Sequence, residues 1–308
     1  MSAIDTAHQP RRKAWKPARR ETLYFYIFIT PWLLGFFIFT LGPMVASAFL
    51  SLTEFSIMSA PKWIGLDNFR NMVTDPLFWT SIKNTLFMVA FDLPLGLMAS
   101  LGAAVLLNQK MRGTNIFRAI FYLPVLIPAV ANILLWVWIF DKDAGILNVL
   151  LKAIHLPPQP WLTSVVWSKP SLVFMNLWAI GGAMLVYLAG LKGIPMELHE
   201  AGKIDGASSW QAFWKITIPL LTPTILFQLI IGLIYEFQIF TAGYILGGGP
   251  NFSTTFYSLY LFNNAFRYLR MGYASALAWV LFAITLIVTL LVFRSTPYWV
   301  HYEAERQR

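Results

Sequence analysis

The sequence predicts an all-α integral membrane protein with six transmembrane helices and both termini in the cytoplasm. Hydrophobic residues make up 57% of its 308 residues and charged residues only 12%, whereas a water-soluble domain is about half apolar and about a quarter charged. Six stretches also approach the roughly 20 apolar residues that a helix needs to cross a bilayer. Lipid is therefore the expected solvent for most of the chain.

The six predicted spans are found as long stretches with few charges. They lie near Thr22–Leu50, Thr85–Leu107, Ile116–Phe140, Ser171–Leu191, Pro223–Leu246 and Tyr273–Phe293. The predicted organisation is a basic cytoplasmic tail over 1–21, a transmembrane domain over 22–293 and a cytoplasmic tail over 294–308. The transmembrane domain includes a cytoplasmic loop over 192–222.

The first span has a second interpretation, because "RRKAWKPARR" followed by an apolar run and "ASA" is similar to a cleavable signal peptide. The apolar region of a signal peptide is about 7–15 residues long. In this sequence the apolar run is nearly twice that length before it reaches a site with the small residues that signal-peptide cleavage needs. This length favours a retained membrane helix.

The distribution of basic residues predicts the orientation. With the N-terminus inside, the cytoplasmic segments hold 15 Lys and Arg residues and the outer segments hold 8. Cytoplasmic loops of membrane proteins carry such an excess. The same asymmetry accounts for the net charge of +9 without a nucleic-acid partner.

The predicted cytoplasmic loop carries an unusual module, "ELHEAGKIDGASSWQAFWKITIPLLTP", Glu197–Pro223. Its pattern predicts a helix, a break and a second helix. Pro195 suits the first helical position, and Gly206 suits a helix end because glycine adopts the left-handed conformation. Ser208 and Gln211 match a capping box for the second helix.

Pro219 and Pro223 are expected to close this second helix and to open the fifth span. Trp210, Phe213 and Trp214 offer large apolar surfaces, and such aromatic side chains are good anchors in a partner's groove. An amphipathic helix lying on the inner leaflet would have a similar composition. The residue pattern alone leaves both interpretations open.

The module closely resembles the EAA motif of ABC-importer permeases, which forms the coupling helix that contacts an ATPase. The matching positions are Glu200, Ala201, Asp205, Gly206, Ala207, Phe213, Ile216, Pro219 and Pro223. Gly202 departs from the motif, where alanine is usual. Glycine costs a helix about 1 kcal/mol relative to alanine, so a looser helix is expected here.

Five further strings resemble the carbohydrate-uptake branch of this family, which includes the maltose and glycerol-3-phosphate permeases. They are "WIGLDNFRNMVTDPLFW", "FRAIFYLPVLIPAV", "GILNVLL", "LGGGP" and "GYASALAWVLF". The resemblance covers roughly residues 23–293 and implies the type I ABC-importer permease (MetI-like) fold in a bacterial or archaeal plasma membrane. It implies three partners: a cytoplasmic ABC ATPase dimer, a second permease that completes a heterodimer, and an extracytoplasmic sugar-binding protein.

The sequence offers no chemistry for catalysis. It has no G-x-x-x-x-G-K-[ST] motif, and its "HEAGK" lacks the second histidine of the zinc motif. The four histidines are scattered and there is no cysteine. We therefore expect no catalytic residue, metal or cofactor in this chain, with ATP and Mg²⁺ bound by the partner ATPase.

Two carboxylates within the predicted spans are candidates for the substrate pathway. Asp92 and Glu236 lie in apolar stretches, and a charge at mid-bilayer costs about 2.5–3.5 kcal/mol, so it usually faces a cavity or a partner. They could accept hydrogen bonds from sugar hydroxyls, or instead pair with the second permease. Trp178, Tyr235 and Phe240 are candidate stacking residues, although packing or lipid contact is more common for such aromatics.

Two further expectations concern the outer face and the transported solute. The run Gly247, Gly248, Gly249 and Pro250 could let a binding protein approach closely, with ordinary turn chemistry as the alternative. Apart from Arg118, at the cytoplasmic edge of the third stretch, no Lys or Arg lies inside a predicted span, which favours a neutral di- or oligosaccharide. A secondary transporter that couples an ion through Asp92 or Glu236 is the competing hypothesis, but it leaves the Glu197–Pro223 module unexplained.

Overall fold

The computed structural model describes residues 19–109 and 112–301. The chain divides after Phe49 into two compact units. In the first, α1 (Arg19–Phe36) continues through a π-helical turn (Phe37–Leu41) into α2 (Gly42–Ser51). Pro43 has no backbone N–H, and the wider turn just before it accommodates the missing hydrogen bond. The first apolar stretch is thus helical throughout.

The second unit starts with an antiparallel hairpin of β1 (Thr53–Ser56) and β2 (Ser59–Trp63). The purely α-helical prediction is wrong for this segment. Thr53 is buried, and the Asn68 side-chain amide donates to the carbonyls of Ser51 and Thr53 at 2.8 and 2.9 Å. The side chain of a following helix therefore holds the hairpin's first strand in place.

Helix α3 (Asp67–Thr74) is followed by α4 (Pro76–Asn108), the longest helix of the chain. Helix α4 begins nine residues before the predicted second span. Asp75 is its N-cap, and the Asp75 carboxylate accepts the Leu77 N–H at 2.8 Å. An N-cap carboxylate and a proline in the first turn are both typical helix starts, so these residues set the boundary.

The predicted third and fourth spans are each a bent pair of helices. A 99° bend separates α5 (Thr114–Tyr122) with its 3₁₀ turn (Leu123–Leu126) from α6 (Ala129–Ile139). Pro128 caps α6 and forces Ile127 to be extended. After α7 (Ile146–Ala153), α8 (Ser168–Asn176) and its 3₁₀ turn (Leu177–Ala179) meet α9 (Gly181–Gly193) at 49°.

The last third of the chain holds the module and two long helices. Helix α10 (Met196–Ile204) and α11 (Ser209–Ala212) are followed by a π-helical turn (Phe213–Thr217) and α12 (Ile218–Phe237). Next come α13 (Thr241–Ile245), a 3₁₀ turn (Pro250–Phe252), α14 (Tyr257–Phe262), a π-helical turn (Asn263–Arg267) and α15 (Met271–Trp299). Four described helical segments are long and apolar enough to cross a membrane, and up to six if each bent pair is one span.

The expected break at Pro219 and Pro223 is absent. The helical path from Ser209 runs directly into α12, with Pro219 in its first turn and Pro223 inside it. Pro223 cannot donate to the Pro219 carbonyl, and the Thr222 hydroxyl donates to that carbonyl instead at 2.6 Å. This substitute bond and the π-helical turn let one helix join the module to the fifth span. Helix α12 itself ends at Phe237, and the apolar segment that could cross a membrane continues to Ile245, close to the predicted end near Leu246.

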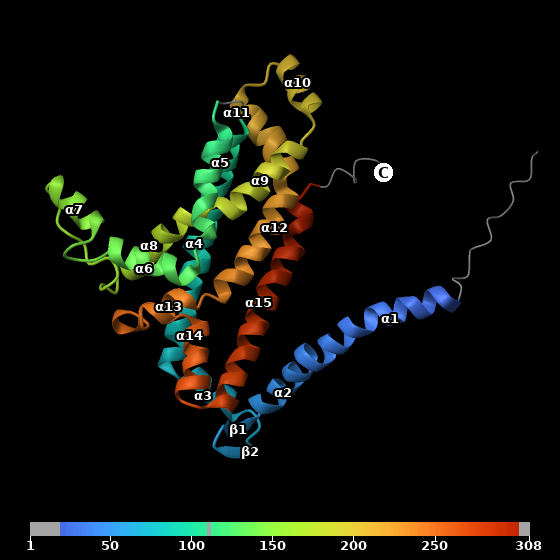
Figure 1. Ribbon diagram of the computed structural model, residues 1–308, viewed down its shortest axis with the longest axis vertical. Helices are drawn as coiled ribbons and strands as arrows, with labels where there is room; N and C mark the ends of the chain where they lie inside the picture. Colours follow the sequence, from blue (N-terminus) through green and yellow to red (C-terminus); the bar gives the residue numbers. More distant parts are fainter. Residues whose placement is uncertain (1–18, 110–111, 302–308) are drawn as a thin grey trace, which may run out of the picture. The chain divides into compact units, whose positions relative to one another are not determined.

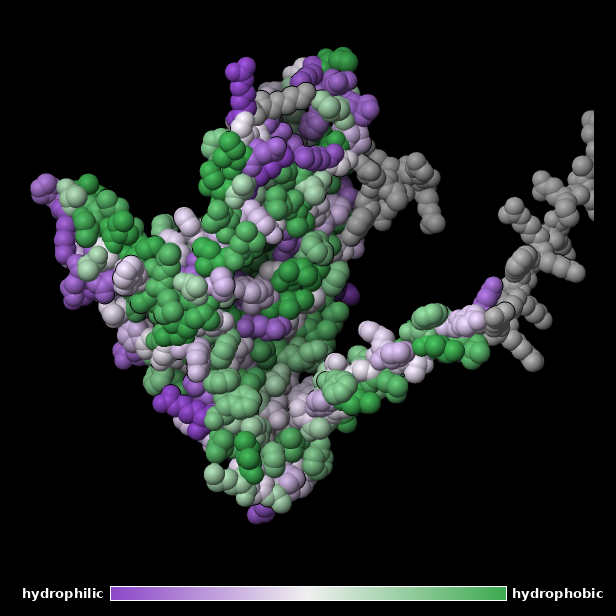
Figure 2. All heavy atoms as spheres, in the orientation of Figure 1, coloured by the Kyte–Doolittle hydropathy of each residue, from purple (hydrophilic) through white to green (hydrophobic). Residues whose placement is uncertain are grey.

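Helix α4 is at the centre of the second unit. Its small side chains Ala103 and Ala104 pack with Tyr187 of α9 and Leu221 of α12, while its Leu93 packs against Leu233 and Phe237. Figure 1 shows α10 and α11 at one end of this unit and the hairpin and α3 at the other. Hydrophilic side chains gather around the end that carries α10 (Figure 2).

Gly272 should tolerate no side chain. A Cβ there would lie 2.0 Å from the carbonyl oxygen of Thr53, and a backbone atom cannot move away cheaply. We expect Gly272→Ala to lower the melting temperature and the yield of folded protein, because overpacking of this kind costs about 1–3 kcal/mol or more. Gly102→Ala is the control, since its Cβ would meet no atom within 4 Å. Equal melting temperatures for the two variants would contradict this close approach.

Candidate functional site

The helix–break–helix prediction for the module is confirmed. Pro195 is the N-cap of α10, one position before the predicted place. At the other end Gly206 has φ +78°. The Gly206 N–H donates to the Lys203 carbonyl at 3.1 Å, and the Ala207 N–H donates to the Gly202 carbonyl at 2.9 Å. These two bonds form a complete Schellman motif, so Gly206 ends α10 as expected.

The second helix starts with the predicted capping box. The Ser208 hydroxyl accepts the Gln211 N–H at 3.3 Å, and the Gln211 side-chain oxygen accepts the Ser208 N–H at 2.9 Å. Only Ala207 separates the glycine turn from this cap. Two adjacent, locally satisfied motifs therefore fix the direction of α10 relative to α11.

The predicted coupling residues lie along this path. Glu200, Ala201, Asp205 and Gly206 are exposed, and none of the residues of α10 is buried. The carboxylates of Glu200 and Asp205 accept no hydrogen bond within the described ranges. Asp205 occupies the C-cap through its backbone alone, so its side chain is available to a partner. Phe213 and Ile216 are half-buried in the π-helical turn, and Pro219 and Pro223 are half-buried in α12.

The module also exposes apolar surface. Ile204 is 87% exposed, Trp210 69% and Trp214 51%. The rings of Trp210, Phe213 and Trp214 lie 5.2–6.0 Å apart, centroid to centroid. Contiguous exposed apolar side chains, unlike single scattered ones, are typical of contact surfaces.

Gly202 has a packing role that the sequence does not reveal. A Cβ at this position would lie 2.9 Å from Cδ1 of Ile216, so the missing side chain lets α10 approach the π-helical turn. From the sequence, glycine at this position is expected only to loosen α10. The structure adds a second role, which is to make room for Ile216.

A pair of variants tests this role. We expect Gly202→Ala to lower the free energy of unfolding modestly, by about 1 kcal/mol, because the flexible end of Ile216 must move. The double variant Gly202→Ala with Ile216→Val removes Cδ1 and should have a higher melting temperature than Gly202→Ala. A double variant no better than Gly202→Ala would contradict the packing role.

Within the apolar helices, a second cluster joins α4, α8 and α12. Asp92 and Glu236 are only 4% and 6% exposed, and their carboxyl groups are in hydrogen-bonding contact. The Asn176 amide donates to Asp92 Oδ2 at 2.5 Å. Glu236 Oε2 is buried without a hydrogen-bond partner among the described residues.

This cluster opens on a cavity of about 440 Å³ lined by α4, α9 and α12, with Asn176 at the end of α8. A smaller cavity of about 140 Å³ lies beside it, and Asn176 and Tyr235 line both. Gln228 and Ser100 add polar groups to the larger one, and no Lys, Arg or His is among the described residues that line either cavity. Together they form a polar surface within an apolar helix bundle, on which Glu236 Oε2 is an acceptor without a partner in the described ranges.

The aromatic candidates occupy different places. Tyr235 is 68% exposed beside the larger cavity, and Phe240 lines the smaller one. Phe240 also packs on Tyr244 and Phe262, with ring centroids 5.3 and 5.0 Å away. Trp178 is half exposed and packs its edge on Trp136, and it lines neither cavity.

Three polar residues of the site were missed at the sequence level: Asn176, Gln228 and Ser100. Each is a polar side chain inside an apolar stretch, the same signal that identified Asp92. Only the packing of the helices shows that Asn176 bonds Asp92 across 84 positions of sequence.

The predicted docking run is a tight turn. Gly247, Gly248 and Gly249 all have positive φ, at +62°, +85° and +68°. The Thr254 N–H donates to the Gly248 carbonyl at 2.9 Å, and a Cβ on Gly248 or Gly249 would lie about 2.5 or 2.6 Å from a threonine hydroxyl. Turn geometry explains these three glycines, and contact with a binding protein remains a prediction. Pro250 begins the following 3₁₀ turn.

Comparison with known proteins gives one consistent result. Residues 92–298 match the family described as "Binding-protein-dependent transport system inner membrane component". The chain is 44% identical to the probable ABC transporter permease protein YesP of Bacillus subtilis, over 96% of this chain and 97% of that protein. It is 34% identical to the lactose transport system permease protein LacF of Rhizobium radiobacter, over 87% and 92% of the two chains.

A solved structure shares the fold. It is a bacterial alginate ABC transporter in complex with an alginate pentasaccharide-bound periplasmic protein, and one of its chains superposes with a TM-score of 0.81 at 26% identity. The match covers 92% of this chain and 96% of that one.

Proposed function

This chain belongs to the family of binding-protein-dependent transport system inner membrane components and is a multi-pass membrane protein, and on that premise we propose that it is the permease subunit of an ATP-driven sugar importer. A separate cytoplasmic ATPase dimer binds ATP and Mg²⁺, a second permease completes the pathway, and an extracytoplasmic protein delivers the sugar. Both termini of this chain are then cytoplasmic.

The observation that carries this proposal is the exposed module. Its α10 has no buried residue, yet the Schellman turn and the capping box give it a fixed direction. Exposed carboxylates at Glu200 and Asp205 and exposed apolar side chains at Ile204 and Trp210 supply both charge and surface for a partner. The α11–α12 continuity would carry a displacement of the module directly into the helix that holds Glu236.

The substrate pathway is proposed to follow the polar cavities. Asp92 and Glu236 provide acceptors for hydroxyl donors, Asn176 orients Asp92, and Tyr235 offers an exposed ring beside them. A cavity with two carboxyl groups and no basic residue disfavours an anionic solute. We propose a neutral di- or oligosaccharide.

Reconstitution tests this function. We expect the tagged chain, purified in mild detergent from its own organism, to bring an ATPase and a second permease with it. Vesicles containing this complex should accumulate sugar only with ATP inside and binding protein outside. A chain that purifies alone and transports sugar along a proton or sodium gradient without ATP would overturn the proposal and favour ion coupling through Asp92 or Glu236.

A further inference from the structure

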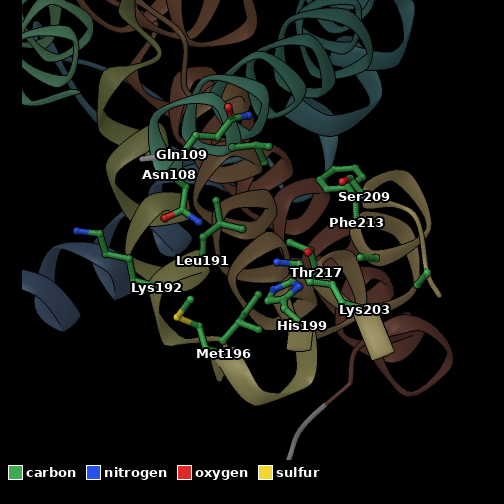
Figure 3. Close-up of a pocket in the computed structure, with 14 residues that line it drawn as sticks. Asn108, Gln109, Leu191, Lys192, Met196, His199, Lys203, Ser209, Phe213 and Thr217 are labelled. Atoms are coloured by element: carbon green, nitrogen blue, oxygen red, sulfur yellow. The ribbon is translucent and has the colours of Figure 1, made fainter. Parts of the chain in front are cut away.

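A third cavity, of about 600 Å³, lies between the cytoplasmic-module helices α10 and α11 and the ends of α4 and α9. Figure 3 shows this cavity and the side chains around it. Among the described residues that line it, three can carry positive charge, Lys192, His199 and Lys203, and none is Asp or Glu. No residue of the proposed sugar pathway lines this space, and of the proposed coupling residues Ala207 and Phe213 border it.

Within the described residues, no ion pair compensates the positive charge of the cavity. The described ranges contain one ion pair, Arg70–Asp67, which is far along the sequence. Glu200 is three positions from Lys203, but no ion pair joins them in the part of the chain that the structure describes. Since like charges that share a cavity repel each other, an anion there would be stabilised by all of them.

His199 and Lys203 are four residues apart and therefore project from the same side of α10. Figure 3 shows both near Thr217, with Lys192 reaching outward at the edge of the cavity. Asn108 and Gln109 from the end of α4 and Ser209 from α11 add neutral hydrogen-bonding groups to the lining. Cationic groups combined with amide and hydroxyl donors are the set that binds a phosphate group.

We propose that this cavity binds a phosphate group, either the headgroup of an anionic phospholipid or a free phosphate. Lysines whose only role is to set the orientation of the protein in the membrane do not need to share a cavity. Lys192 and Lys203 do share one, and it is large enough for a lipid headgroup. Basic pockets beside membrane helices on the cytoplasmic side are suited to anionic lipid headgroups. Because no residue of α10 is buried, a bound phosphate braces this helix against the ends of α4 and α9.

Binding is measured on the full-length purified chain. Delipidated protein is titrated with phosphatidylglycerol or phosphatidylcholine and examined by native mass spectrometry. In parallel, its melting temperature is recorded in inorganic phosphate and in chloride at equal ionic strength. We expect the variant Lys192→Gln with Lys203→Gln to bind the phosphate ligand more weakly, by about fivefold for each lysine removed.

The matched control is Lys142→Gln with Lys152→Gln, which removes two lysines from the α6–α7 loop and α7. Preferential retention of phosphatidylglycerol that only the cavity variant loses supports a lipid source. Stabilisation by inorganic phosphate that only the cavity variant loses supports a soluble source. Equal behaviour of the two double variants, or no response to either ligand, overturns the proposal. If the double variant fails to fold, Lys203→Gln alone takes its place. None of these readouts depends on ATPase coupling.

Discussion

Gly206→Val is expected to abolish most ATP-driven uptake while leaving the protein folded in the membrane. Gly206 has φ +78°, and the left-handed conformation costs an ordinary residue about 1–2 kcal/mol, with β-branched valine among the least tolerant. No residue of α10 is buried, so little packing energy holds the turn against this cost. The fraction of chains that present α10 correctly, and with it uptake, should fall about 5- to 30-fold.

Gly65→Val is the matched control for this experiment. Gly65 has φ +60°, and a Cβ at Gly65 or at Gly206 would meet no atom within 4 Å. The backbone strain is therefore comparable, but Gly65 lies next to the hairpin and far from the module along the chain. Uptake, ATPase stimulation and the amount of protein in the membrane are measured for both variants. Equal losses of uptake would show that general strain, rather than presentation of α10, is responsible.

Glu236→Gln is expected to reduce sugar uptake about tenfold or more. Two carboxyl groups in contact can hydrogen-bond only when they hold a proton between them, and Glu236 Oε2 has no partner within the described residues. An amide of the same shape keeps the packing but occupies the Asp92 contact with its own donors. The single negative charge of the pair is then confined to Asp92, so position 236 can no longer offer a charged acceptor to the sugar. A hydrogen bond to a charged group contributes about 1.5–3 kcal/mol.

The ATP dependence of uptake and the amount of protein in the membrane distinguish a binding role of Glu236 from a structural one. If Glu236 accepts a sugar hydroxyl, the variant should keep its ATP dependence and its membrane level. Glu54→Gln changes an exposed glutamate of the hairpin and should leave uptake unchanged. A Glu236→Gln protein that transports normally, or whose uptake falls only in proportion to its membrane level, would remove Glu236 from the pathway.

The long stretches with few charges predicted the apolar helices because a helix that crosses a bilayer needs about 20 apolar residues. The glycine and serine signals of the module were sufficient because both caps are local. The bends at Pro128 and near Gly181 were not predicted, since a proline or glycine in an apolar run also fits a continuous helix. The continuity of α11 with α12 depends on the Thr222 hydroxyl replacing the hydrogen bond that Pro223 cannot make. The pattern of apolar and polar residues along the sequence does not reveal such a side-chain hydrogen bond.

The cluster of Asp92, Asn176 and Glu236 was predicted only in part, because its contacts also depend on how the helices pack. Asp92 and Glu236 were conspicuous as charges, but their contact requires α4 and α12 to pack at one register. Asn176 gave the same kind of signal more weakly, because a neutral amide in a span costs less than a charge. The role of Gly202 required the position of Ile216, which only the folded π-helical turn provides.

In the proposed importer, α10 contacts a separate ATPase. The chain has no cysteine, so Ile204→Cys introduces a single reactive thiol at a side chain that is 87% exposed. Ile57→Cys, on the hairpin at a side chain that is 61% exposed, is the control. A photo-cross-linker that couples to the new thiol through a maleimide and inserts into nearby C–H bonds through a benzophenone, applied to the purified complex, should join the Ile204→Cys variant to the ATPase subunit on irradiation. The yield should change when ATP is added, and the Ile57→Cys variant should stay unlinked to the ATPase. An ATPase that co-purifies but is never joined through position 204, or is joined equally through position 57, would contradict the account.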